Sequence, residues 1–159
     1  MPDLEGEIEL EILKAIVYGL GKAEAEIVGE PNIFSKLAYE EAGKWWLERM
    51  GAHGLVRKEF DDPIKAFKEY IELMEKGNLF QKDDIKAEKV GDNVIVVTGG
   101  IKCPFREACE KLAEEGFKEH GCPLIGPFIR ILKDIGFSVG YTIKTEVKKP
   151  CTIRIEYIS

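Results

Sequence analysis

Long apolar runs are absent from this sequence of 159 residues, and so are the signals of several common protein classes. Its hydrophobic stretches are short and interrupted by charges, so none reaches the roughly 20 residues of a membrane-spanning helix. The chain opens with MPDLEGEIELEILKAI, which is acidic, whereas a secretory signal begins with basic residues before an unbroken apolar run. We therefore expect a cytoplasmic protein with no membrane partner.

An excess of positive charge is also missing. Lysine and arginine number 23 and aspartate and glutamate number 29, which gives a formal net charge of −6. An acidic surface repels phosphate backbones, so we expect no nucleic-acid partner. Glutamine is scarce while glutamate and lysine are abundant, a composition typical of thermophile proteins.

The common catalytic and nucleotide-binding signatures are not found. The stretch VTGGIKCP lies between an expected strand and an expected helix, but it lacks the lysine and hydroxyl residue of a P-loop and the glycine spacing of a dinucleotide-binding turn. H-E-x-x-H, G-x-S-x-G and kinase motifs are absent as well. The motifs alone therefore give no reason to expect an enzyme.

The residues that are present predict a single α+β domain over 1–159. Hydrophobic residues make up 45% of the chain, enough for a real core at this length. Residues 1–80 read as mainly helical, and 81–159 read as strands, a helical pair and a C-terminal hairpin. We expect the helices first and then strands that form an antiparallel sheet, with the helical pair inserted between them.

Apolar periodicity and capping residues set the expected elements. We expect helices at 4–20, 32–50, 63–76, 104–120 and 123–136. Two strands are expected within 84–100 about a Gly-Asp-Asn turn, and two more at 137–147 and 151–158. Residues 22–31 are expected to be a connection, and 51–62 a linker or a short strand that leaves His53 exposed.

Four cysteines are the most informative scarce residues. The stretch CPFREACEKLAEEGFKEHGCP contains Cys103, Cys109 and Cys122, and Cys151 follows a proline downstream. Each is expected near the boundary of an element, where chain segments converge. Four thiolates can close a tetrahedral zinc site, and an iron–sulfur cluster accepts four cysteines too.

The spacing of these cysteines matches no standard zinc signature, so other interpretations stay open. His120 or Glu146 could replace one cysteine as a metal ligand. The thiols could also be reduced, partly buried apolar residues, or they could form disulfides. A nucleophilic cysteine is a further alternative, for which Cys122 with His120 is the better candidate pair.

The C-terminal part of the chain resembles the 4-vinyl reductase domain family. A cysteine precedes a glycine-containing apolar helix that ends in glycine, a strand with a late glutamate follows, and a cysteine opens the last strand. These positions are Cys122, Gly126, Gly136, Glu146 and Cys151. The order of the upstream helices and hairpin also fits, so the resemblance covers most of the chain and is strongest from about residue 85.

The resemblance implies a fold shared with haem nitric-oxide sensors and Golgi transport-particle subunits, in which N-terminal helices are packed on a twisted antiparallel sheet. It also implies a homodimer formed through N-terminal helices, and an archaeal stand-alone member would match this length. Phenol-sensing relatives hold a structural zinc with cysteines and a glutamate, and Cys122, Glu146 and Cys151 match that pattern. One family cysteine is absent here, so either the zinc is lost or Cys103 and Cys109 supply the missing thiolates. We expect the second, a site of Cys103, Cys109, Cys122 and Cys151 that holds zinc in preference to an iron–sulfur cluster.

Three hypotheses follow from the resemblance. The first is a protein that binds a small apolar or aromatic ligand and carries a structural zinc. An enzyme or accessory factor of tetrapyrrole or other cofactor metabolism is the alternative, and a pure interaction module is the third. The expected ligand-lining residues are aromatic or aliphatic: Trp45, Trp46, Phe67, Phe105, Phe128 and Ile131.

Overall fold

The computed structural model describes residues 4–29, 33–49 and 62–158. Three helices come first: α1 (Leu4–Val28), α2 (Phe34–Arg49) and α4 (Pro63–Lys76). A short 3₁₀ helix, η1 (Lys82–Asp84), leads into the strands β1 (Ile85–Gly91) and β2 (Val94–Gly99). The remaining elements are α5 (Arg106–Glu114), α6 (Gly126–Asp134), β3 (Ser138–Lys144) and β4 (Cys151–Ile158).

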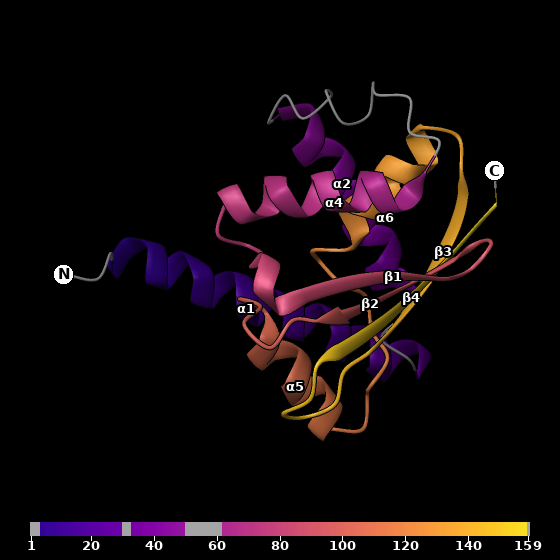
Figure 1. The fold of residues 1–159 in the computed structure, drawn as a ribbon. Coiled ribbons are helices and arrows are strands. Elements are labelled where there is room, and N and C mark those ends of the chain that lie inside the picture. Colours follow the sequence, from indigo (N-terminus) through magenta and orange to yellow (C-terminus); the bar gives the residue numbers. More distant parts are fainter. Residues whose placement is uncertain (1–3, 30–32, 50–61, 159) are drawn as a thin grey trace.

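This order confirms the predicted α+β class, with N-terminal helices, an antiparallel sheet and helices interleaved between the strands (Figure 1). The third helix begins as its sequence predicts, because the Asp62 carboxylate accepts a hydrogen bond from the Ile64 N–H at 3.0 Å and Pro63 occupies the first turn. The expected linker and His53 lie outside the described residues, apart from Asp62.

The expected end of the first helix was wrong. Helix α1 continues through Gly19 and Gly21 to Val28, and residues 22–28 are helical instead of a connection. The segment is rich in alanine and glutamate, which favour helix strongly enough to carry two glycines. The helix ends where Gly29 adopts a φ of +84°, a left-handed conformation that glycine reaches without steric cost.

Helix α5 is shorter than predicted. It ends at Glu114 because Gly116 adopts a φ of +98° and the Phe117 N–H bonds back to the Leu112 carbonyl at 2.9 Å. The following segment is extended and pairs with the sheet edge through a bridge from Glu119 to Lys144. His120 therefore lies on an extended segment and not on a helix.

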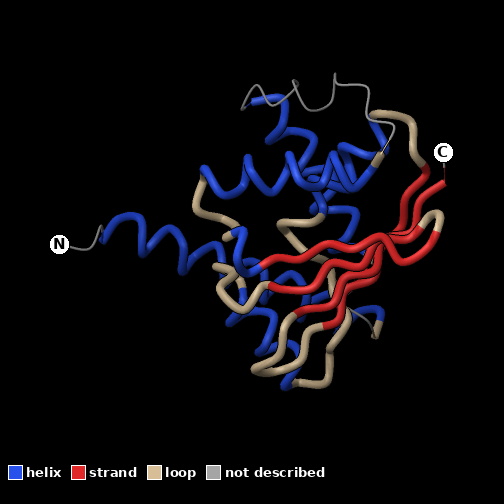
Figure 2. Tube along the Cα trace, in the orientation of Figure 1, coloured by secondary structure: helices blue, strands red, loops and turns tan. Residues whose placement is uncertain are grey.

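The four strands form an antiparallel sheet in the order β1-β2-β4-β3. Strand β4 lies inside the sheet, where Ile155 is aligned with Ile95 on one side and Tyr141 on the other. Its side chains alternate between buried and exposed, so one face of the sheet meets the core and the other meets solvent. Figure 2 shows the strands side by side along one side of the molecule.

The core lies between the inner face of the sheet and helices α4 and α6. Phe67 and Phe128 meet edge to face with ring centroids 5.0 Å apart, and Tyr70 lies 5.5 Å from Phe128. Each of these three side chains is at most 1% exposed. The aromatic cluster anchors α4 to α6 above the sheet.

Helix α2 packs against the start of α6 with almost no space between their backbones. A Cβ atom added to Gly43 would lie 2.5 Å from the Cα of Pro127, and one added to Gly126 would lie 2.6 Å from the Cβ of Tyr39. Only glycine allows this approach, so these two positions fix how α2 crosses α6.

Helix α1 joins this core over only part of its length. Figure 1 shows its N-terminal half projecting from the rest of the molecule. Ile8, Ile12 and Ile16 recur at four-residue spacing and are 54%, 55% and 57% exposed. At the other end, the buried Glu24 carboxylate accepts hydrogen bonds from the Ile33, Phe34 and Ser35 N–H groups and so caps α2. No helix within the described ranges is long and apolar enough to cross a membrane.

Candidate functional site: a cysteine cavity beside an apolar cleft

All four cysteines line one small cavity, which we call the cysteine cavity. Cys103 lies in the turn after β2, Cys109 in α5, Cys122 before α6, and Cys151 at the start of β4. The cavity measures about 30 Å³, room for a single water molecule or ion. Four segments of the chain therefore each contribute one cysteine side chain to the wall of the same cavity.

Gly100 allows two of these segments to meet. It adopts a φ of +86°, and a Cβ atom there would lie 3.7 Å from the Cys151 sulfur and 3.9 Å from the Cys103 Cβ. The left-handed conformation reverses the chain after β2 and brings Cys103 back toward the first residue of β4. The glycines of VTGGIKCP thus form a sharp turn.

Burial favours the protonated form of three of the thiols. It raises the pKa of Cys103 to about 11 and that of Cys122 to about 12, and it raises the pKa of Cys109 well above its ordinary value. The negative charge of neighbouring cysteines adds to the rise in each case. Without a bound cation these thiols are neutral at pH 7, which makes them poor nucleophiles.

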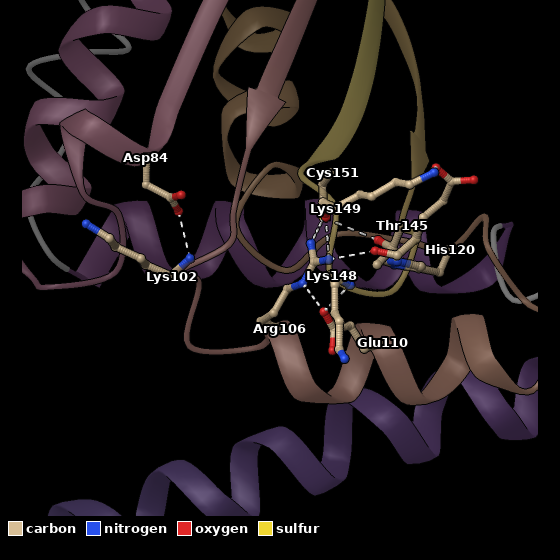
Figure 3. Close-up of polar contacts among 10 residues, drawn as sticks. Asp84, Lys102, Arg106, Glu110, His120, Thr145, Lys148, Lys149 and Cys151 are labelled. Atoms are coloured by element: carbon tan, nitrogen blue, oxygen red, sulfur yellow. Dashed lines mark hydrogen bonds and ion pairs between the residues drawn. The ribbon is translucent and has the colours of Figure 1, made fainter.

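Arg106 brings a positive charge to the fourth cysteine. Its side chain is 9% exposed, and Nη1 donates a hydrogen bond to the Cys151 sulfur at 3.2 Å (Figure 3). Its Nε lies 2.7 Å from the Glu110 carboxylate, and Nη2 donates to the backbone carbonyls of Glu146 at 2.7 Å and of Lys149. One guanidinium thus ties α5 to the loop that leads into β4.

Thr145 and His120 contact Cys151 from the other side. The His120 Nδ1 lies 2.7 Å from the Gly121 carbonyl, so this nitrogen carries the ring proton, and Nε2 accepts from the Thr145 hydroxyl at 2.8 Å. The Thr145 oxygen lies 3.3 Å from the Cys151 sulfur and can accept its proton. Burial lowers the pKa of His120, which keeps the ring neutral. The histidine therefore reaches Cys151 through Thr145, whereas the sequence favoured a pair with Cys122.

Glu146 is turned toward surface lysines. Its carboxylate lies 3.5 Å from the Lys149 ammonium, 3.8 Å from that of Lys118 and 4.0 Å from that of Lys144. The charge of Lys149, followed by that of Lys144, lowers the pKa of the Glu146 carboxyl. The four cysteines thus line the cavity without this glutamate.

The cysteine cavity offers the type of ligand atom and the number of ligands that a structural zinc site needs. The four cysteine side chains can supply the four thiolates of a closed tetrahedral site, and His120 is not among the residues that line the cavity. In the described part of the chain, however, no three or more histidine, cysteine, aspartate or glutamate side chains are already placed to hold a metal ion. Metal binding would therefore require the cysteine side chains to move toward one another.

A second hollow, the apolar cleft, adjoins the cysteine cavity. Its volume is about 290 Å³. Its walls come from α1, α2, α4 and the segment after it, the segments that precede α5 and α6, and the first turn of α6. The lining residues are mainly apolar or aromatic: Leu13, Tyr39, Ala42, Gly43, Trp46, Tyr70, Met74, Leu79, Phe105, Pro123, Leu124 and Pro127.

The expected ligand-lining residues are split between this cleft and the core. Trp46 and Phe105 line the cleft. Phe67, Phe128 and Ile131 are at most 1% exposed and belong to the core cluster. Trp45 is 62% exposed on the other side of α2, where the Arg49 guanidinium lies 4.9 Å from its ring centroid.

The cysteine cavity and the apolar cleft share a wall. Phe105 and Pro123 line both hollows. Phe105 follows Cys103 by two residues, and Pro123 directly follows Cys122. The two hollows are therefore built in part from the same two short segments.

Two residues of the site were not identified from the sequence. Arg106 belongs to the helix that carries Cys109, and a charged residue there reads as solvent-facing until the fold is known. Thr145 could have been found, because it continues the inward alternation of Tyr141 and Ile143 as a polar residue at a buried position. It is 0% exposed.

No family model matches this sequence, and no curated protein is significantly similar to it.

Proposed function

We propose that this protein binds a small apolar or aromatic molecule in the apolar cleft. The observation that carries the proposal is a cleft of about 290 Å³ with an almost wholly apolar lining that includes two aromatic side chains from the sequence prediction, Trp46 and Phe105. Ligand sites are typically concave and apolar, with few polar groups. An apolar protein cavity of about 150 Å³ is large enough to bind benzene, so a ligand of one or two rings fits this volume.

The fluorescence of Trp46, which lines the cleft, can report ligand binding directly. In a Trp45→Phe background, toluene and indane are titrated while the fluorescence of the remaining tryptophan is followed, and we expect a saturable change. Ala42→Phe, which fills the cleft, should weaken binding at least tenfold. Lys44→Phe adds the same ring to an exposed position of α2 outside the cleft and should leave binding unchanged. A change that never saturates, or equal loss in both variants, would overturn the proposal.

A structural zinc in the cysteine cavity is the second part of the proposal. It is supported by the convergence of Cys103, Cys109, Cys122 and Cys151 on a hollow the size of one ion. The four thiolates would hold the metal, which when bound would supply a redox-inert cross-link between α5, the segment before α6, the β2–α5 turn and β4. Zinc binding would also displace the protons that burial otherwise keeps on Cys103, Cys109 and Cys122.

Metal content and thermal stability test this part together. Zinc should be present at about one per chain, and Cys151→Ser should lower the zinc content and the melting temperature in the same sample. Thr152→Ser, on the next residue of β4 and facing the opposite side of the sheet, should change neither. Visible absorption by the purified protein would indicate an iron–sulfur cluster instead, and four freely reactive thiols without metal would show that the cysteines are only apolar packing residues.

A second copy of this chain is the proposed partner, through the exposed stripe of Ile8, Ile12 and Ile16 on α1. A projecting helix with a continuous apolar face is unusual on a monomer and typical of an association surface. Sedimentation velocity should show a dimer that Ile12→Glu converts to a monomer. Val90→Glu, at a 53% exposed position of β1, introduces the same charge and should leave the dimer intact.

A further inference from the structure

A buried arginine distinguishes Cys151 from the other three cysteines. The Arg106 Nη1 group donates a hydrogen bond to the Cys151 sulfur at 3.2 Å, and the whole arginine residue is 8% exposed. A neutral thiol is a weak hydrogen-bond acceptor, so a buried guanidinium gains little from it. A thiolate is a strong acceptor for the same N–H group, because both partners are charged.

The partners of Arg106 leave its charge only partly compensated when the thiols are protonated. Glu110 supplies one carboxylate, but that carboxylate is 26% exposed and also accepts the Lys148 N–H at 3.1 Å. The other oxygen contacts come from the uncharged carbonyls of Glu146 and Lys149. Among the described residues, the guanidinium meets the Cys151 sulfur on the side of the cysteine cavity, and no carboxylate lines that cavity.

A metal held by four thiolates would change this balance of charge. A divalent ion with four negative ligands carries two net negative charges in surroundings that are apolar apart from Arg106, and burying such charge is costly unless it is compensated. A cation in direct contact with one sulfur reduces that cost. Residues that hydrogen-bond to metal ligands also fix the ligands' orientation.

We propose that Arg106 is the charge-compensating and positioning residue of the cysteine site, which it serves by hydrogen bonding to Cys151 and stabilising a negatively charged tetrathiolate metal centre. This inference rests on the proposed metal site. It also assigns a purpose to the contacts of Arg106 with the 146–149 loop. By holding both carbonyls, the guanidinium places the start of β4, and therefore the Cys151 sulfur, beside the cavity.

The experiment tests whether the charge of Arg106 and its hydrogen bond to Cys151 stabilise the bound metal. Zinc affinity is measured by competition with a chromophoric chelator, and the cobalt-substituted protein is examined for its sulfur-to-cobalt charge-transfer band. Arg106→Met should weaken zinc binding by about 10- to 100-fold, the usual effect of losing a partner of a metal ligand. It should also move the band to longer wavelength, because the sulfur loses an N–H donor that stabilised its lone pairs.

Two companion variants separate compensation of charge from mere structural support. Arg106→Lys retains the charge without the planar fork and should recover part of the affinity and part of the band shift. Glu110→Gln removes a negative charge near the site and should keep zinc affinity or raise it by about two- to fivefold. If Arg106 were only a structural clamp, loosening it through Glu110→Gln would lower zinc affinity.

Arg154→Met is the matched control for the change in net charge. Arg154 lies on β4 three residues after Cys151, is 51% exposed and pairs with Glu156 on the solvent face. It should leave both readouts unchanged. Normal zinc affinity and an unmoved band in Arg106→Met would overturn the role of Arg106 alone, as would loss of affinity in Glu110→Gln. A parent protein that takes up neither zinc nor cobalt would overturn the metal proposal and this inference together.

Discussion

Helices α6 and α1 are attached to the molecule in different ways. In α6, Phe128, Ile129 and Leu132 are fully buried, and the helix packs on the sheet, α4 and α2. In α1, Ile8 and Ile12 are more than half exposed. The difference shows that α6 is part of the core, whereas α1 keeps an apolar face that the rest of the described chain does not cover.

Polar contacts hold α1 where apolar packing does not. The Tyr18 hydroxyl donates to the Glu115 carboxylate at 2.7 Å, and the Lys22 ammonium lies 2.9 Å from the same group, on the residue that caps the end of α5. Glu24 reaches across to cap α2. We therefore expect substitutions in α6 to change stability strongly and substitutions in α1 to change it weakly.

Phe128→Ala should have the largest effect. Removing this fully buried ring leaves a cavity among Phe67 and Tyr70, and we expect the free energy of unfolding to fall by about 3–5 kcal/mol. Chemical denaturation measures it. Phe34→Ala, at a 61% exposed ring on α2, is the control and should cost little. A loss below about 1 kcal/mol for Phe128→Ala would show that α6 is not a core helix.

Opposite signs are expected for glycine-to-alanine changes in the two helices. Gly126→Ala forces a methyl group to within 2.6 Å of Tyr39 and should destabilise by about 1–3 kcal/mol. Gly19→Ala meets no atom within 4 Å and should stabilise α1 by about 0.5–1 kcal/mol. Thermal unfolding of both variants measures the difference. Two changes of the same sign would contradict the packing contrast.

The cap that Glu24 provides to α2 should be worth less than core packing. Glu24→Gln replaces one acceptor oxygen with an amide that faces backbone N–H donors, and we expect a loss of about 1–2 kcal/mol. Glu26→Gln makes the same change at an exposed position of α1. Equal melting temperatures for the two variants would mean that the cap contributes nothing.

The smallest expected effect is a pH-dependent one at the contact of α1 with α5. Hydrogen bonds from Lys22 and then Tyr18 lower the pKa of Glu115 to about 2 from its ordinary 4.5. Because the folded-state pKa is depressed, the contribution to stability is present above pH 4.5 and is lost as the pH falls toward 2. The melting-temperature difference between the parent and Glu115→Gln should shrink over that window. Glu114→Gln should show no such trend.

Sequence reasoning predicted the fold where local signals agree with packing. The capped start at Asp62, the turn between β1 and β2, and the alternating strand at Cys151–Ile158 all depend on nearby residues and are confirmed. It was wrong at the ends of α1 and α5. Each helix ends at the glycine that adopts the left-handed conformation. The sequence alone does not show that Gly21 stays helical whereas Gly116 ends its helix.

The sequence pointed to the four cysteines of the cavity but not to Arg106 and Thr145, which contact Cys151. The four cysteines could be grouped from the sequence because each was expected at an element boundary. The contact of Arg106 with Cys151 spans 45 residues and depends on how α5 lies against the loop before β4. Such a contact leaves no local pattern, so the charged partner of the site became visible only in the folded chain.

The position of β4 has a consequence for how the chain folds during synthesis. Strand β4 follows the other three described strands in the chain, yet it lies between β2 and β3 and carries the fourth cysteine. The inner edge of β2 therefore has no partner until residues 151–158 have left the ribosome, and the cysteine cavity stays open for the same time. The core can therefore close only after β4 has emerged, and a chain that stalls before residue 151 exposes an unpaired strand edge for chaperones to protect.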